Sequence, residues 1–177
     1  MKNVIDMAAE MIRQFEGCSL TAYRCPAGVW TIGWGETLGV KEGDVWTQGQ
    51  ADAVLLRRVG QFLLATLKRC PQLHAEAAGR LAACTSLAYN IGVGAFGASS
   101  VRRKAMRRDH AGAADAFLLW NKAGGRVLRG LTLRRQAERL GYLSHERLTE
   151  GRCRVCGMPC IGWGCTLPSC RRASLTN

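Results

Sequence analysis

The sequence predicts a mostly helical α+β fold in which a small β-hairpin lobe and a helical lobe flank a cleft. A helical pattern near the N-terminus stops at Gly17, and the apolar period then changes to two over residues 20–34. Further helical patterns follow as far as residue 143. At 177 residues the chain is long enough to bury a core of its own.

The first helix is predicted from apolar residues at the spacing of an amphipathic helix. These residues are Ile5, Ala8, Met11, Ile12 and Phe15. Gly17 suits the position just after a helix, which places Glu16 in the last turn. The negative end of the helix dipole favours the protonated form of a carboxylic acid there, and such an acid can donate a proton to a leaving group.

A hairpin is predicted next, with strands at 20–23 and 29–34 joined by the turn 25–28. Trp30, Ile32 and Trp34 share one face of the second strand, and we expect this face to pack on the helices. Thr31 then points toward the groove that the hairpin forms.

The remaining elements follow from periodicity and from cap and breaker residues. We expect a short third strand within 38–46, a helix from a capping box at Thr47 to about 67, and a helix over 74–89. A glycine-rich loop at 89–96, a short basic helix capped by Ser99 or Ser100, a helix at 111–120, a loop at 121–126 and a helix at 131–143 complete the order.

Three residues of this first region have a spacing that is informative together. The sequence has Glu16, then Cys25 after eight residues, then Thr31 after five more, followed by Ile-Gly-x-Gly. This motif resembles the active-site signature of phage-type lysozymes (endolysins of glycoside hydrolase family 24). The resemblance covers roughly residues 3–145. Its later landmarks are Tyr89-Asn90-x-Gly92-x-Gly94-x-Phe96, Trp120 before Ala123-Gly124-Gly125, and Gly130-Leu131 before Arg134-Arg135-x-x-Glu138. It implies a lysozyme-like two-lobed fold.

The same resemblance implies an endolysin muramidase that hydrolyses the β-1,4 bond between N-acetylmuramic acid and N-acetylglucosamine in peptidoglycan, without a cofactor, and so lyses the host cell. Glu16 is then the general acid, while Cys25 and Thr31 hold or activate a water in inverting chemistry. Tyr89 and Asn90 would line the cleft. Thr37 and Ser99 are further sugar-contact candidates. For Tyr89 a place in the core, and for Asn90 and Ser99 a capping role, stay open.

Cys25 stands where an aspartate is commoner in the family. An ordinary thiol is only a few per cent ionised at pH 7. Cys25 therefore has a lowered pKa, helped by Arg24, or acts as a positioning group or as a covalent nucleophile. A disulfide with Cys18 would disable the site in an oxidising compartment. Glu36, where many family members carry His, is either an auxiliary carboxylate near the cleft or a solvent-facing residue.

The charge of the chain indicates a polyanionic partner. The formal net charge is +12 and the sequence pI is about 9.8. Nucleic acid, an anionic membrane face and anionic cell-envelope polymers all satisfy this charge, and composition does not choose between them. The resemblance favours the envelope polymers besides the peptidoglycan glycan strands, with no nucleic acid expected.

The expected place of action follows from the N-terminus. The first dozen residues include two acids, which argues against a signal peptide. We expect a monomer made in the host cytoplasm that acts in the periplasm or cell wall after release through a holin, as endolysins without a signal do.

Two domains are predicted, a catalytic domain at 1–148 and a Cys-rich basic tail at 149–177. Cys153, Cys156, Cys160 and Cys165 are candidate metal ligands in the tail, with disulfides or disorder as alternatives. A lytic transglycosylase and a non-catalytic basic protein that binds envelope or nucleic acid remain alternative functions.

Overall fold

The computed structural model describes residues 2–25, 27–144, 160–161 and 164–165 of the chain. The described elements are α1 (Lys2–Arg13), β1 (Ser19–Arg24), β2 (Trp30–Gly33), α2 (Gln48–Arg69), the 3-10 helix η1 (Pro71–Ala75), α3 (Ala78–Ile91), α4 (Val93–Ala98), α5 (Ser100–Met106), α6 (His110–Phe117), β3 (Lys122–Ala123), β4 (Arg126–Val127), α7 (Arg129–Leu143), β5 (Cys160–Ile161) and β6 (Gly164–Cys165). The predicted fold class, mostly helical with a small antiparallel hairpin, is confirmed.

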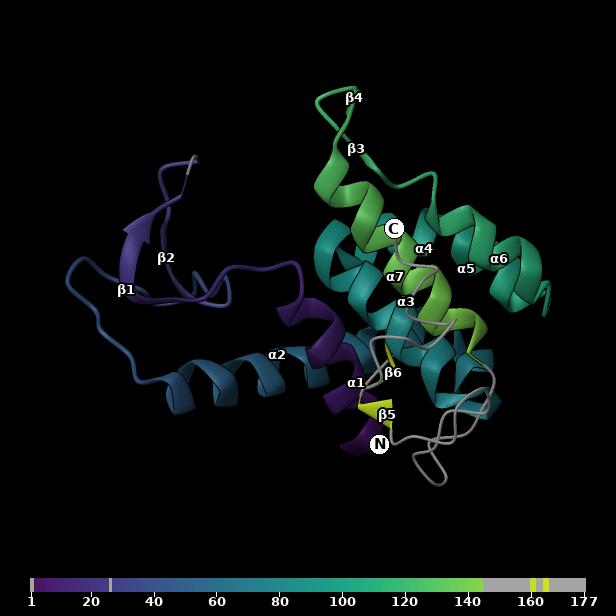
Figure 1. Ribbon diagram of the computed structural model, residues 1–177, viewed down its shortest axis with the longest axis horizontal. Helices are drawn as coiled ribbons and strands as arrows, with labels where there is room; N and C mark the ends of the chain where they lie inside the picture. Colours follow the sequence, from purple (N-terminus) through teal and green to yellow (C-terminus); the bar gives the residue numbers. More distant parts are fainter. Residues whose placement is uncertain (1, 26, 145–159, 162–163, 166–177) are drawn as a thin grey trace.

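The hairpin and the helices form two separate regions, and α2 runs from one to the other (Figure 1). α3 lies at the centre of the helical region and packs against α7, α1 and α2. A Cβ atom on Gly79 in α3 would lie 2.6 Å from the carbonyl oxygen of Gly141 in α7. This close approach requires glycine, and it fixes the face that α7 turns toward the core.

The hairpin pairs β1 with β2 antiparallel, with Tyr23 opposite Thr31 and Arg24 opposite Trp30. Ile32 is fully buried and Trp34 packs partly buried against the helical core, as predicted for this face. Trp30 departs from that prediction, because it is only half-buried and its ring lies 5.0 Å from the Arg24 guanidinium. The bulky face therefore contacts the helices mainly at its C-terminal end.

The expected third strand at 38–46 is not a regular strand in the structure. This segment makes one isolated bridge to the hairpin, from Val45 to Thr21, and a second bridge joins Ile32 to Glu36 just before it. Glycines with positive φ at 39 and 43 interrupt the extended conformation.

The predicted helices occur with shifted boundaries. The capping box at Thr47 is present, with Gln50 as its partner, and α2 follows it. A 3-10 turn replaces the start of the helix expected at 74, and α3 begins at Ala78 instead. The expected loop at 89–96 is helical on both sides of Gly92, whose φ of 87° breaks the chain direction between α3 and α4.

The loop expected at 121–126 contains a two-residue pairing of β3 with β4. The boundary predicted at 148 and the tail residues Cys153 and Cys156 lie outside the described residues. Cys160 and Cys165 stand opposite one another in the pairing of β5 with β6. Among the described helices, none has the length and apolar character needed to cross a membrane.

Candidate active site

Glu16 lies where α1 meets the hairpin. α1 ends at Arg13, yet the backbone amide of Glu16 still donates to the carbonyl of Ile12 at 3.0 Å, so the helical turn continues beyond it. The Glu16 side chain is 30% exposed. Its carboxylate is therefore anchored by the main chain and accessible from one side.

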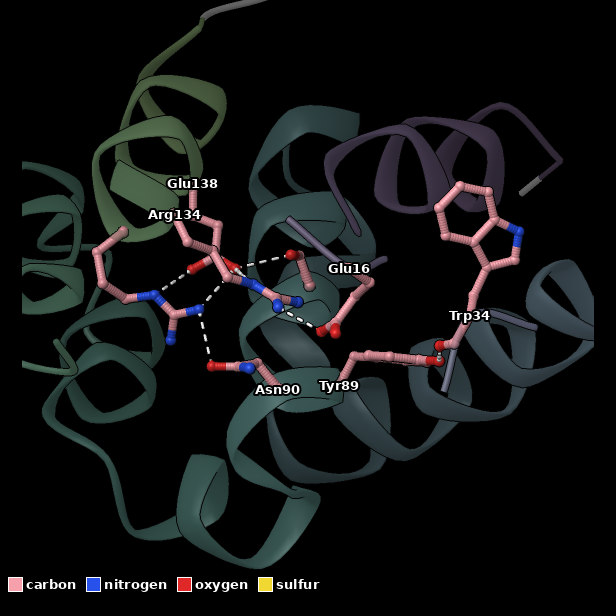
Figure 2. Close-up of polar contacts among 8 residues, drawn as sticks. Glu16, Trp34, Tyr89, Asn90, Arg134 and Glu138 are labelled. Atoms are coloured by element: carbon pink, nitrogen blue, oxygen red, sulfur yellow. Dashed lines mark hydrogen bonds and ion pairs between the residues drawn. The ribbon is translucent and has the colours of Figure 1, made fainter. Parts of the chain in front are cut away.

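A buried arginine from the far end of the sequence contacts this carboxylate. Nη1 of Arg134 in α7 donates to Oε1 of Glu16 at 2.5 Å, and its Nε donates to Oε1 of Glu138 at 3.3 Å. Figure 2 shows Arg134 reaching from Glu138 to Glu16. Its guanidinium supplies an opposite charge that sequence reasoning from the helix dipole alone did not include.

Glu138 is the centre of a buried polar cluster. It is fully buried and accepts hydrogen bonds from the Ser86 hydroxyl at 2.7 Å and from Arg135 Nη2 at 3.1 Å. Burial raises the pKa of Glu138 against the opposing effect of the two arginines. Burial likewise lowers the pKa of Arg135 to about 10, which leaves it charged at neutral pH.

The charges of this cluster balance only when Glu16 is counted. Arg134 and Arg135 carry two positive charges, and Glu138 supplies one negative charge. The carboxyl group of Glu16, once it has given up its proton, supplies the second. A buried charge without a partner is costly, so Glu16 also stabilises the packing of α7, although its own side chain is partly exposed.

Asn90 connects the cluster to a nearby pocket. Arg135 Nη2 donates to Asn90 Oδ1 at 3.1 Å, which fixes the orientation of the side-chain amide. The pocket has a volume of about 470 Å³ and is lined by Asn90, Ile91, Trp120, Lys122, Ala123, Leu128 and Leu131. The structure thus gives Asn90 a place on a pocket wall, next to the charge cluster.

Tyr89 joins α3 to the end of the hairpin. Its hydroxyl donates to the Trp34 carbonyl at 3.2 Å (Figure 2). Its ring lies 5.0 Å from that of Phe62. Burial, together with the nearby charge of Glu16, raises the pKa of Tyr89, so the phenol stays neutral. Tyr89 is partly buried and packs against the core, while its place in a cleft stays a prediction.

Cys25 and Thr31 come together at the end of the hairpin. Hydrogen bonds from the backbone amides of Val29 and Ala27, and from the Thr31 hydroxyl, lower the pKa of Cys25. The same hydroxyl lies 3.1 Å from the Val29 carbonyl, which is a second acceptor within its reach. Of the alternatives for Cys25, these contacts favour the lowered pKa, with backbone amides as its cause in place of Arg24.

Two expectations for this end of the molecule need correction. Thr31 is 4% exposed, so its hydroxyl does not face an open groove. Cys18 and Cys25 flank opposite ends of the extended β1, which separates their Cα atoms by about 20 Å, whereas a disulfide needs about 7 Å or less. Both are free thiols.

Glu36 is neither solvent-facing nor free as an auxiliary carboxylate. It is 6% exposed, and its Oε1 accepts hydrogen bonds at 3.0 Å from the amides of Thr37 and Leu38. Its Oε2 lies 3.5 Å from Arg58 Nε in α2. Glu36 therefore holds the turn after β2 against α2. The Thr37 side chain is exposed beside this turn, and its role as a sugar contact stays a prediction.

Ser99 is a helix cap. Its hydroxyl accepts from the Arg102 amide at 3.1 Å and donates to the Phe96 carbonyl at 2.7 Å, and the residue is 2% exposed. Both its donor and an acceptor site are used inside the protein, so the structure favours capping over sugar binding.

Sequence reasoning proposed Glu16, Cys25 and Thr31, which stay predictions, but missed the residues that surround Glu16. Arg134, Arg135 and Glu138 were recognised only as landmarks. Their signal is positional, because Arg134 and Arg135 each lie three or four residues from Leu131 and from Glu138, and Tyr142 lies four residues after Glu138. That spacing places three charged residues on the inward stripe of α7.

Comparisons with known proteins extend over most of the described chain. The family profile described as phage lysozyme matches residues 13–138. An endolysin of Acyrthosiphon pisum secondary endosymbiont phage 1 is 41% identical over 135 residues, which cover 73% of this chain and 90% of that protein.

Solved structures give the same result for the fold. The muramidase domain of SpmX from Asticaccaulis excentricus superposes with a TM-score of 0.71 and 31% identity, covering 78% of this chain and 95% of that one. The active form of the P1 phage endolysin Lyz superposes with a TM-score of 0.69 and 28% identity, covering 77% and 83%.

Proposed function

Because this chain belongs to the phage lysozyme family, a family of glycoside hydrolases acting on peptidoglycan, we propose that it is a muramidase. Its target is the β-1,4 bond between N-acetylmuramic acid and N-acetylglucosamine. The observation that carries this proposal is the half-exposed carboxylate of Glu16, held by a buried arginine within the family's motif. It is a group that a glycan can reach and that the protein orients.

In the proposed reaction Glu16 protonates the departing glycosidic oxygen. Arg134 occupies its Oε1, so Oε2 is the oxygen that faces the substrate with the proton. As the proton leaves, the developing carboxylate gains its full charge beside the guanidinium of Arg134, which stabilises it. The buried guanidinium of Arg134 therefore favours release of the proton from Glu16.

Cys25 and Thr31 serve the water in this proposal. A thiolate held by backbone amides accepts a proton or a hydrogen bond from the water that attacks the anomeric carbon. The buried Thr31 hydroxyl orients the thiolate of Cys25. The result is hydrolysis with inversion, and a reducing sugar end is the product.

We further propose that the protein acts as a monomer and lyses the host cell after a holin has released it from the cytoplasm to the cell wall. Neither alternative function gains support from a specific observation. The lytic transglycosylase would use the same acid without water, and the non-catalytic binding protein would make no use of the Glu16 arrangement.

The deciding experiment is a turbidity assay on outer-membrane-stripped cells with wild-type protein and the Glu16→Gln variant. We expect turnover to fall by about 10²–10⁴-fold, the contribution typical of a general acid. Glu10→Gln is the matched control, since it removes an exposed carboxylate from the same helix. A fully active Glu16→Gln protein contradicts the assignment. Product analysis separates hydrolysis, which leaves a reducing end, from transglycosylation, which leaves an anhydro ring.

A further inference from the structure

Seven cations gather at one end of the helical region, away from the hairpin. They come from the C-terminal end of α2 and from α5 with the turn that follows it. We call them the basic face; its members are Lys68, Arg69, Arg102, Arg103, Lys104, Arg107 and Arg108. In Figure 1, α5 lies on the opposite side of the molecule from β1 and β2.

Backbone contacts hold the two parts of this face together. Nε of Arg102 donates to the Arg69 carbonyl at 2.6 Å, which ties α5 to the end of α2. Nη1 of Arg102 reaches the Gly97 carbonyl at 3.4 Å, and Nη1 of Arg103 donates to the Ala98 carbonyl at 2.7 Å. Neutral carbonyls orient these guanidinium groups without cancelling their charge.

Few carboxylates compensate the basic face. Lys104 pairs with Asp109 at 3.2 Å, and Arg108 lies 3.6 Å from Glu76. The other five cations form no ion pair with any residue that the structure describes. Fixed, uncompensated guanidinium groups suit phosphate oxygens, which their forked donors match in geometry.

The chemistry of the face also indicates the kind of polyanion. The apolar side chains of α5 point inward, since Val101 is fully buried and Met106 packs against the core. Peripheral binding to a lipid bilayer combines basic charge with apolar side chains that enter the membrane. A face that offers charge alone suits a water-soluble polymer.

We propose that the basic face binds a phosphodiester-linked polyol phosphate chain of the cell envelope, of the teichoic acid type, and tethers the enzyme to the wall. The envelope location of this partner rests on the proposed function; the binding chemistry does not. Because the face lies away from the hairpin, a polymer bound there leaves the region of Glu16 accessible.

The test measures binding of poly(glycerol phosphate) to the full chain as a function of salt. The variant Lys68→Gln/Arg107→Gln removes two exposed cations for which no hydrogen bond or ion pair is seen within the described residues. Each lost contact should lower the slope of log affinity against log salt by about 0.7–0.9, so we expect a slope smaller by about 1.5 and roughly tenfold weaker binding at low salt. The control Lys41→Gln/Arg57→Gln removes the same charge elsewhere on the surface and should change the slope less.

Several outcomes overturn the proposal. One is equal loss of binding in both double variants, which would mean diffuse attraction. Another is binding to duplex DNA that is at least as tight as binding to the polymer and is lost in the Lys68→Gln/Arg107→Gln variant. The same result with phosphatidylglycerol vesicles would also overturn the proposal. Hydrolysis of soluble glycan fragments should be unchanged in that variant, while its action on polymer-bearing walls slows and its action on stripped walls does not. If the wild type hydrolyses no glycan but binds the polymer with this pattern, the proposed function fails and the binding face stands.

Discussion

The two sides of the candidate site are built by different physical means. On the helical side, Glu16 is held by a cluster of buried charges on α7, which also accepts a hydrogen bond from Ser86 of α3. On the hairpin side, Cys25 is held by backbone amides within a few residues of its own position. The first arrangement ties function to the stability of the whole helical region. In the second arrangement, the pKa of the Cys25 thiol can change without loss of stability in the helical region.

The largest expected effect tests the dependence on the helical side. Glu138→Gln leaves two buried guanidinium groups with too little negative charge, so the free energy of unfolding should fall by about 3–5 kcal/mol. Denaturant unfolding measures this. Asp115→Asn is the control, because Asp115 also pairs with an arginine of α7, at 2.8 Å, but on an exposed surface. There a loss of about 1 kcal/mol or less is expected, and similar losses in both variants would contradict the distinction.

The next effect concerns the bridge between Glu138 and Glu16. Arg134→Lys keeps one charge but removes the fork that contacts both carboxylates. Loss of the fixed orientation of Glu16 should lower kcat by about 10–100-fold, with a smaller change in KM. A variant whose kcat equals that of the wild type would show that Arg134 is structural only.

On the hairpin side the expected effect is a shift of pH dependence with little change in stability. Cys25→Asp replaces a thiol by a carboxylic acid of lower ordinary pKa, so the required ionised form persists at lower pH. The acid limb of the kcat/KM profile should move down by about one pH unit or more, with activity retained. Cys18→Ser, at the other end of β1, is the control and should leave the profile unchanged. An unshifted profile for Cys25→Asp would mean that ionisation at this position does not limit the reaction.

The smallest effect is expected where the two sides meet. Tyr89→Phe removes the hydrogen bond to the Trp34 carbonyl while keeping the ring contact with Phe62. The loss in unfolding free energy should be about 0.5–1.5 kcal/mol, measured by thermal or denaturant unfolding. A loss as large as that of Glu138→Gln would place the critical coupling at the hairpin junction instead of in the charge cluster.

Local patterns predicted most of the fold, and they supplied the candidate residues on both sides of the proposed site. Amphipathic spacing, the capping box at Thr47 and the change of period after Gly17 are short-range signals, and the structure contains the elements that they indicate. The motif with Glu16, Cys25 and Thr31 spans a single unbroken window for the same reason.

What the sequence did not predict depends on long-range contacts or on exact backbone angles. The partner of Glu16 is 118 residues away in the chain, and a single sequence does not report which charged residue of α7 reaches it. Glu36 could not be placed, because its burial depends on Arg58 from another element. The helix α4 was not predicted, because Gly92, whose φ is 87°, and the glycines that follow it are typical of a loop.

The bridge from Arg134 to Glu16 also sets the order in which the enzyme becomes competent. A growing polypeptide exposes the acid and the hairpin early, whereas the guanidinium that orients the acid is added more than a hundred residues later. Until α7 has docked against Gly79, a partly synthesised chain or a fragment that lacks this helix contains Glu16 without the contact from Arg134 that orients its carboxyl group.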